Sequence, residues 1–212
     1  MYDFAKKYGY GLHIQREKIV QDMHINWTKI ALLQNAVHQG DGFSCLIDAD
    51  TIVINKNFSF EEWTKKLSGA LGILMTKDTP LFQRNRPNAG LILVDHAKGG
   101  VIMDDWMSAA RNEGSHLADT HPRNQLVYWN YVQPKHQDRQ VMVSNAYAAK
   151  YHWFMPYIPS GKRFLFHFTQ TEQQGRTSSM RKIYFKYWKN SETLDMIKGK
   201  LDEQREGLLT LC

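Results

Sequence analysis

Short apolar runs alternate with amphipathic segments along most of the chain. Apolar runs of strand length predict β-strands within residues 44–54, 72–76, 91–94, 141–143 and 164–166. Apolar residues that recur every three or four positions predict helices at residues 2–8, 26–37, 60–71, 97–111 and 126–131. Helices that alternate with apolar strands are typical of an α/β fold.

Residues at the ends of the first two helices support this assignment. Gly9 is expected to end the first helix, because glycine readily adopts the left-handed conformation found there. Leu12 and Ile14 then predict an extended segment. Asn26 is expected to cap the start of the second helix, since its side chain can accept a hydrogen bond from a free backbone N–H.

Two carboxylates, Asp48 and Asp50, interrupt the apolar run between Ser44 and Asn55. Burying a carboxylate costs free energy unless a cation meets it. In open α/β sheets, ligands bind beyond the carboxyl ends of strands, and carboxylate oxygens suit Mg²⁺ or Mn²⁺. The pattern therefore predicts a strand end at which both acids reach a divalent metal. The alternative is a surface turn in which both acids are solvated.

Length and composition describe one globular domain. The chain has 212 residues, of which 42% are hydrophobic and 23% charged, enough for one domain with a substantial core. We expect this domain at residues 1–190, followed by a charged C-terminal helix or tail at residues 191–212. No stretch approaches the roughly 18 consecutive apolar residues of a transmembrane helix, and the N-terminus lacks the apolar core of a signal peptide. Cys45 and Cys212 do not form a disulfide framework, so a cytoplasmic location is expected.

Positive charge is concentrated late in the chain. The formal net charge is +6. Between Gly161 and Lys189, seven basic residues are opposed by Glu172 alone, which leaves a local excess of six positive charges (7 − 1). Such a strip suits a nucleotide diphosphate, a nucleic acid or an acidic lipid surface. A solvated basic face is the commoner meaning of the pattern.

Several short motifs occur in an order and spacing that resemble a known family. They are residues 4–10 (FAKKYGY), 27–30 (WTKI), 47–51 (IDADT), 88–90 (NAG), 105–106 (DW), 124–125 (NQ), 145–147 (NAY) and 167–168 (HF). Together they resemble the metal-dependent nucleotide-sugar glycosyltransferases of the GT-A fold, in particular the galactosyl- and xylosyltransferases of glycosyltransferase family 34. The resemblance implies a single GT-A-like (Rossmann-like) domain with a mixed central sheet flanked by helices.

The resemblance implies a metal site. Asp48 and Asp50 would hold Mn²⁺ (or Mg²⁺) against the diphosphate of the donor, with His167 as the third protein ligand. Asp50 is counted among the catalytic residues for this reason. Without the family pattern, a lone histidine in an apolar run such as residues 164–168 is more often a buried core residue.

The resemblance also implies substrate contacts. Lys29 is similar to the family's lysine that reaches the phosphates, and Asn88 and Gly90 resemble an acceptor-side loop. Gln125 resembles the catalytic residue beneath the anomeric carbon, and its neighbour Asn124 is assigned to substrate binding. Taken alone, these residues also fit an exposed lysine, a plain turn before a strand and the first turn of a helix.

The chain departs from the family pattern in three places. Arg123 and Asn124 stand where acids usually precede the glutamine. Residues 169–172 replace the glycine and lysine that usually follow the His-Phe pair, which moves the expected phosphate-binding cation to Arg176. The family's first strand, which contacts the nucleotide base, has no counterpart before Tyr2.

The resemblance implies transfer of a sugar from a nucleoside-diphosphate sugar, UDP-linked, to a hydroxyl acceptor with retention of configuration. The acceptor is a saccharide, a lipid-linked glycan or a modified DNA base. A rival enzyme is a haloacid-dehalogenase-type phosphatase, in which Asp48 would attack phosphorus and Asp50 act as the acid. Against it, Ile52 replaces the usual small hydroxyl residue.

A rival without catalysis is a nucleic-acid-binding module. Residues 181–189 interleave basic and aromatic side chains, which together can hold a polyanion in a salt-dependent way. The two interpretations are compatible if the acceptor is DNA.

Overall fold

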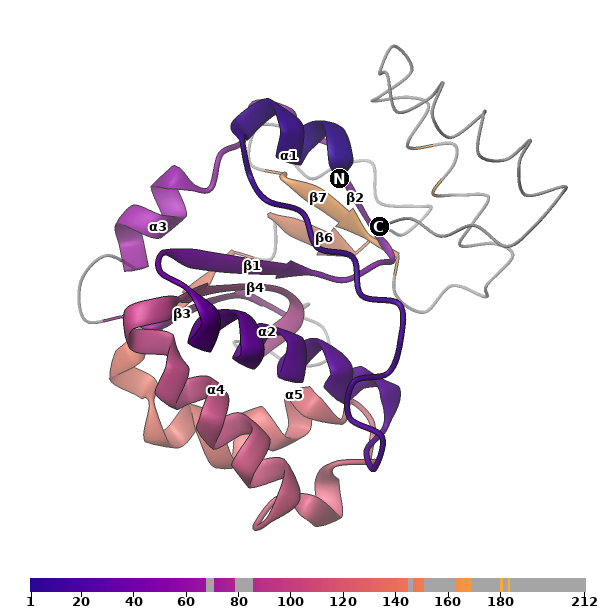
Figure 1. Cartoon of the computed structure of the whole chain (residues 1–212), viewed down its shortest axis with the longest axis vertical. Helices are drawn as coiled ribbons and strands as arrows, with labels where there is room; N and C mark the ends of the chain where they lie inside the picture. Colours follow the sequence, from indigo (N-terminus) through magenta and orange to yellow (C-terminus); the bar gives the residue numbers. More distant parts are fainter. Residues whose placement is uncertain are drawn as a thin grey trace, which may run out of the picture. The chain divides into compact units, whose positions relative to one another are not determined.

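The computed structural model describes residues 1–67, 71–78, 86–144, 147–150 and 163–168, together with Met180 and Ile183 (Figure 1). The chain divides into two compact units. The larger unit consists of residues 17–49 and 60–148, and the smaller unit of residues 1–16, 50–59 and 149–212. The larger unit contains a four-stranded sheet, and the smaller unit is built around a three-stranded sheet.

The sheet of the larger unit is mixed, as predicted. Its strand order is β1-β4-β3-β5. Strand β4 pairs antiparallel with β1 and with β3, whereas β3 and β5 are parallel. Every residue of β4 is buried, which explains why its later part is a continuous apolar run in the sequence. The strands are β1 (Phe43–Ile47), β3 (Ile73–Lys77), β4 (Pro87–Asp95) and β5 (Gln140–Val143).

Three helices of the larger unit lie along one side of this sheet in Figure 1. They are α2 (Thr28–Gln39), α4 (His96–Arg111) and α5 (Asn124–Val127). The expected apolar faces are buried: Ile30 and Leu33 of α2, and Ile102 and Trp106 of α4, are at most 3% exposed. Burial of these stripes against one another and the sheet forms the core of the unit.

The remaining helical segments of this unit are short. Helix α3 spans Glu61–Leu67, within the segment where a helix is predicted at residues 60–71. The predicted helix at residues 126–131 is α5 continued by the π-helical segment η3 (Tyr128–Val132). Single 3-10 turns are η1 (Ile25–Trp27), η2 (Ser115–Leu117), η4 (Gln133–Lys135) and η5 (Gln137–Arg139). The longest described helix, α4, has 16 residues. No described helix has both the length and the apolar character of a membrane span.

The smaller unit combines one helix with a three-stranded sheet. Helix α1 (Tyr2–Tyr8) ends at Gly9, whose φ of 68° is left-handed, as the sequence predicts. The ring of Phe4 packs 5.2 Å from that of Phe164, which anchors the helix within this unit. The strand order is β2-β7-β6, with β2 (Thr51–Val53), β7 (Leu165–His167) and β6 (Ala148–Lys150).

The apolar run from residue 44 to 54 forms two strands, not one. Strand β1 ends at Ile47 and β2 begins at Thr51, and the two belong to different sheets. The polar residues Asp48 and Asp50 lie in the break, with Ala49 and Asp50 in a turn. In the described sheet β1 is an edge strand and β4 an inner one.

One smaller prediction, the cap at Asn26, also needs correction. Asn26 does not cap α2, because the 3-10 turn η1 precedes the helix. The cap of η1 is His24, whose Nδ1 accepts from the backbone N–H of Asn26 at 3.2 Å. The segment containing Leu12 and Ile14 forms no strand. Both side chains are exposed, so the segment has no buried face to stabilise a strand.

Two glycines allow α4 to approach the start of β3 closely. A Cβ added to Gly99 would collide with Cγ1 of Val94 and lie 2.7 Å from the carbonyl oxygen of Gly72. A Cβ on Gly72 would lie 2.7 Å from the carbonyl oxygen of Lys98. Both contacts involve backbone atoms, which cannot move aside as a flexible side chain can. Only glycine therefore fits at either position.

We predict that Gly99→Ala lowers the free energy of unfolding by about 2 kcal/mol, because the added methyl group overpacks the helix–sheet contact. The adjacent Gly100→Ala is the control, since its nearest neighbour would be the His38 side chain at 3.4 Å. There the better helix propensity of alanine should leave stability unchanged or raise it by up to about 1 kcal/mol. Denaturant unfolding measures both, and equal effects of the two substitutions would contradict the prediction.

Candidate active site

The backbone holds both acids of the Asp48–Ala49–Asp50 turn in place. In the larger unit, the N–H of Asp48 donates to the carbonyl oxygen of Gly90 at 3.0 Å. In the smaller unit, the carbonyl oxygen of Asp50 accepts from the N–H of Phe168 at 2.8 Å. Each aspartate side chain is 23% exposed. Neither acid is simply solvated, which argues against the surface-turn interpretation.

Asp50 and His167 lie together at the ends of two paired strands. The antiparallel register places Thr51 of β2 opposite His167 of β7, so Asp50 immediately precedes the paired position. The imidazole Nε2 of His167 lies 3.1 Å from Oδ1 of Asp50, and the imidazole is only 6% exposed. The predicted association of these two residues is therefore present in the fold.

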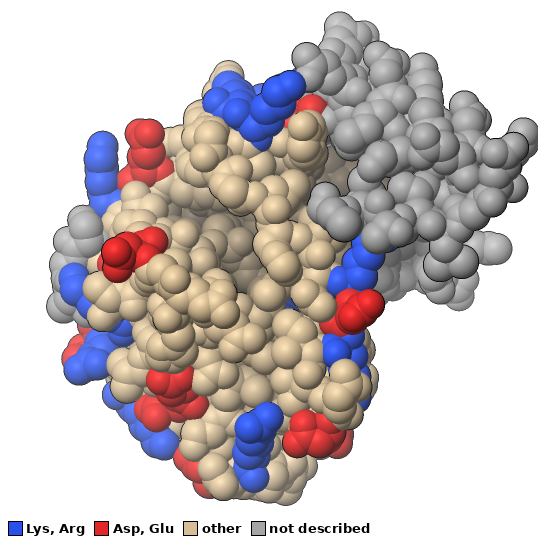
Figure 2. All heavy atoms as spheres, in the orientation of Figure 1, with Lys and Arg blue, Asp and Glu red and all other residues tan. Residues whose placement is uncertain are grey.

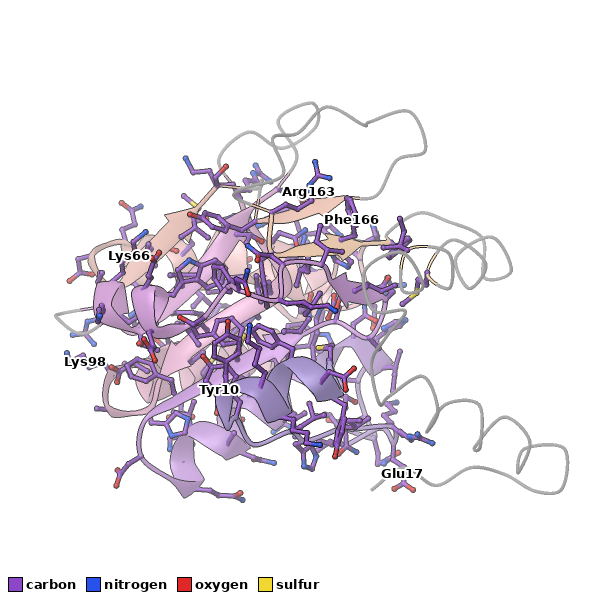
Figure 3. The ribbon with its side chains drawn as sticks, turned by 90° about the horizontal axis from the view of Figure 1, so that it is seen from above. Tyr10, Glu17, Lys66, Lys98, Arg163 and Phe166 are labelled. Atoms are coloured by element: carbon purple, nitrogen blue, oxygen red, sulfur yellow. The ribbon has the colours of Figure 1, made fainter. Side chains whose placement is uncertain are left out.

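The residues on either side of His167 in the sequence are apolar. Phe166 and Phe168 are buried and form a small cluster with Ile52 of β2. The guanidinium of Arg163 packs over the ring of Phe166, 4.7 Å from its centroid, and Figure 3 labels both residues. Because successive side chains of a strand point to opposite faces, this cluster packs on the face opposite to His167 and fixes the strand that carries it.

Asp48 is paired with Lys29 in the larger unit. The ammonium Nζ of Lys29 donates to both carboxylate oxygens of Asp48, at 2.9 and 3.0 Å, and to the carbonyl oxygen of Ala89 at 3.0 Å. The lysine side chain is 21% exposed. Lys29 is thus not an ordinary exposed lysine, and its three donors converge on the predicted site.

Strand β4 bulges beside this pair. Its pairing with β3 shifts between Met75, which faces Ile92, and Thr76, which faces Asn88. Residues 89–91 therefore have no partner on β3, and the backbone of Ala89 is satisfied by side chains instead. Its N–H donates to Oε1 of Gln125 at 2.8 Å, while its carbonyl accepts from Lys29. A bulge next to an active site commonly re-aims side chains in this way.

Asn88 and Gly90 belong to this bulged strand and not to the acceptor-side loop that the family resemblance implies. Both are buried within β4. Oδ1 of Asn88 accepts from the N–H of Gly90 at 2.8 Å, and its Nδ2 lies 3.4 Å from Oδ2 of Asp78. Asn88 therefore stabilises the bulge. The strand extends this far because side chains replace the missing ladder hydrogen bonds.

Asn124 and Gln125 differ in burial and in the hydrogen bonds of their side chains. The Asn124 side chain is buried, donating to the carbonyl of Asn26 at 3.1 Å and accepting from the N–H of Gln125 at 2.8 Å. These two hydrogen bonds fix the start of the helix, and the assignment of Asn124 to substrate binding stays a prediction. Gln125 is half-buried, and its Nε2 makes no hydrogen bond within the described residues. Gln125 thus retains a donor for a ligand.

Ala89 is the residue that sequence reasoning missed as a functional contact. Its N–H and carbonyl connect Gln125 with Lys29, and Lys29 connects in turn with Asp48. A contact made by backbone atoms cannot be predicted from the residue type. The available signal is Gly90, since an isolated glycine in a strand pattern indicates a bulge.

Asp48, Asp50 and His167 form a candidate metal-binding group among the described residues. They offer two carboxylates and one imidazole, a set of ligands that suits Mn²⁺. Asp50 and His167 are brought together by the β2–β7 pairing, and Asp48 is tied to Asp50 through Ala49. The residues present therefore fit a divalent cation.

Other predicted features lie outside the described residues. These are Arg176, the aromatic and basic segment at residues 181–189, and the charged tail from residue 191. Of the basic residues between 161 and 189, only Arg163 is described, and it is 7% exposed, not part of a solvated face. On the face shown in Figure 2, basic and acidic side chains of the described residues are interspersed.

Comparison with solved structures identifies the fold. A glycosyltransferase involved in the glycosylation of the major capsid of PBCV-1 matches with a TM-score of 0.66 and 18% sequence identity, over 85% of this chain and 88% of that one. The glycosyltransferase GlyE of Streptococcus pneumoniae TIGR4 gives a TM-score of 0.48 and 14% identity, over 67% of this chain and 37% of its own length. No protein family matches the sequence, and a search of curated proteins found no match either.

The chain therefore has the GT-A-like fold of a glycosyltransferase, as the sequence motifs predict. Membership of glycosyltransferase family 34 stays a prediction.

We predict that Gln125→Ala lowers the free energy of unfolding by about 1–3 kcal/mol, because it leaves the buried Ala89 N–H without its acceptor. Gln125→Glu keeps a carboxyl oxygen in the same place and should cost much less. Thermal or denaturant unfolding compares the two variants. Equal losses for alanine and glutamate would show that the hydrogen bond to Ala89 does not support the bulge.

Proposed function

We propose that this protein is a metal-dependent glycosyltransferase. It moves a sugar from a nucleoside-diphosphate sugar, UDP-linked, to a hydroxyl acceptor with retention of configuration. The observation that carries the proposal is the 3.1 Å approach of His167 to Asp50, two residues after Asp48, in a chain with a glycosyltransferase fold.

The metal would be held by Asp48, Asp50 and His167. When bound, it supplies Lewis-acid stabilisation of the charge that develops on the departing diphosphate. The chain's own contribution is to hold two carboxylates and an imidazole at one place, with the imidazole only 6% exposed. This environment limits water and keeps the ligands oriented before a substrate arrives.

Lys29 and Gln125 would act on opposite ends of the donor. Lys29 carries a positive charge next to Asp48 and would bind an oxygen of the diphosphate, which stabilises the leaving group electrostatically. Gln125 would place its Nε2 near the sugar, because its Oε1 is already engaged by Ala89. The bulge fixes the two side chains relative to each other, since both bind the backbone of the same residue.

The acceptor is proposed to be a saccharide or a lipid-linked glycan, with a modified DNA base as the second candidate. The second candidate draws on the basic, aromatic segment at residues 181–189. Binding to DNA that weakens steeply with salt would support it. Absence of DNA binding at low salt would exclude it.

A screen of nucleotide sugars in the presence of Mn²⁺ tests the proposed activity directly. Release of nucleoside diphosphate is measured with and without glycan or DNA acceptors. Release of nucleotide, lost on addition of EDTA and restored by Mn²⁺, is the expected result. Release of inorganic phosphate from nucleotides alone would favour the phosphatase instead.

We predict that Asp50→Asn reduces transfer by at least about a hundredfold, since the amide cannot supply the charge of the carboxylate. Folding should be intact, because the substitution is nearly isosteric. Asp41→Asn, which changes an exposed acid in the turn before β1, is the control and should keep full activity. Nucleotide release and circular dichroism provide the measurements. Full activity of Asp50→Asn with Mn²⁺ would refute the metal assignment.

We also predict that Lys29→Met binds Mn²⁺ about fivefold more tightly than the wild type in the absence of nucleotide. The ammonium group of Lys29 occupies both oxygens of Asp48 and competes with a cation for them. Lys135→Met, which removes a lysine paired with Glu113 at 3.0 Å, is the matched control. Isothermal titration calorimetry measures the affinities. Weaker binding of Mn²⁺ to Lys29→Met would mean that Lys29 supports the cation site and does not compete for it.

A further inference from the structure

A cavity of about 580 Å³ opens in the larger unit, away from the candidate active-site residues. It is formed by residues 19–22, by the α2 segment from Ala31 to Asn35 and by the second half of α4. None of the candidate site residues is among the described residues that line it. Its volume lies within the range of about 300–1,000 Å³ that is usual for small-molecule sites.

The floor of the cavity is apolar. Val20, Ala31 and Met107 line it and are only 5–6% exposed. These side chains also belong to the core of the unit, so the floor is held by packing. An apolar floor of this kind can receive the C–H face of a ligand.

One polar group on the wall is held in a fixed position. Oδ1 of Asp104 accepts from Nε2 of Gln34 at 2.7 Å and lies 2.9 Å from Nε2 of His38. Although burial opposes its ionisation, these hydrogen bonds lower the pKa of Asp104 below the ordinary value. The carboxylate is therefore ionised at neutral pH and oriented by its neighbours.

Three other polar side chains of the wall are uncommitted. Asp22, Asn35 and Arg111 line the cavity, and none makes a hydrogen bond or ion pair with another described residue. Together they offer an anionic acceptor, an amide with both donor and acceptor, and a cationic fork of donors. Groups of this kind remain available to a ligand.

The composition of the wall limits the class of ligand. Asp22 and Asp104 against Arg111 give a net negative charge, which disfavours a phosphate or another polyanion. No aromatic ring occurs among the described lining residues, so a nucleobase would find no stacking surface. A sugar meets the remaining requirements, because each hydroxyl donates and accepts and its ring carries apolar C–H faces.

We infer that this cavity is a second saccharide-binding site, separate from the site of transfer. Resting on the proposed function, its role would be to hold a distant unit of the acceptor glycan while another unit is glycosylated. Arg111 and Asn35 would bind hydroxyl groups in pairs, and Asp104 would accept from a third.

The test is a titration of the full chain with neutral oligosaccharides of two to six units, from the malto, cello, xylo, manno and galacto series. Wild-type protein is expected to bind at least one series, and the double variant Asn35→Ala/Arg111→Ala to bind it at least tenfold more weakly. Neither residue has a partner to lose within the described residues, so the variant should fold normally. Arg139→Ala, which removes another exposed arginine of the same unit, is the control and should bind as the wild type does.

A blocking variant gives an independent readout. Asn35→Trp should fill the cavity from its exposed rim and abolish oligosaccharide binding without removing a charge. Failure of every oligosaccharide to bind the wild type would overturn the inference, and so would equal binding by the wild type and both variants.

Nucleotide release from sugar donors, measured without an acceptor, separates this inference from the proposed function. It should be the same in the wild type and the cavity variants. Its loss in the cavity variants alone would overturn the inference of a separate site. Its absence in all the proteins, with oligosaccharide binding retained, would count against the proposed activity while supporting the saccharide site.

Discussion

A carboxylate that is partly removed from water must meet a positive charge or hydrogen-bond donors. Both acids of the candidate site satisfy this requirement. Asp48 meets the ammonium group of Lys29 through both of its oxygens. Asp50 meets the imidazole of His167. The strand that leads into the turn ends at Ile47, and the following one starts at Thr51 in another sheet. The two acids therefore join the two sheets through the chain itself.

The bulge in β4 positions two further side chains through the backbone of Ala89. A regular strand would have engaged the N–H and carbonyl of Ala89 in ladder hydrogen bonds. Because the register shifts at this point, those groups bind Gln125 and Lys29 instead. One irregularity in a fully buried strand thus aligns a candidate catalytic amide with a candidate phosphate-binding cation. Such a platform is rigid, which suits a reaction that depends on the placement of charge.

Periodic elements could be predicted from the sequence, because their burial leaves a pattern in residue type. The apolar stripe of α4 and the left-handed end of α1 at Gly9 are examples. The interruptions could not be predicted in the same way. Asn88 is polar, so the early part of β4 does not match a buried strand, although its side chain satisfies the bulge from within. Asn26 does not cap α2, because the turn η1, capped by His24, precedes the helix and leaves Trp27 at its N-cap.

In the candidate site, too, some features could be predicted from the sequence and others could not. The acids and the histidine were predictable because a known family shares their order along the chain. The phosphate contact of Lys29 stays a prediction, and its pairing with Asp48 could not be predicted, because residue type alone does not give spatial neighbours. The hydrogen bonds of the Asn124 side chain to Asn26 and Gln125 could not be predicted either, and its assignment to substrate binding stays a prediction. Ala89 carries no functional group, and only the three-dimensional structure brings it into the network.

The central claim is that His167 binds the same divalent cation as the two acids. Electron spin echo spectroscopy of Mn²⁺ added to the protein tests this most directly, because it detects nitrogen ligands of the metal. We expect modulation from one imidazole nitrogen in the wild type, its loss in His167→Gln, and its retention when the exposed His116 is replaced by glutamine. Mn²⁺ bound by oxygen ligands alone in the wild type would contradict the claim, as would a nitrogen signal that survives in His167→Gln.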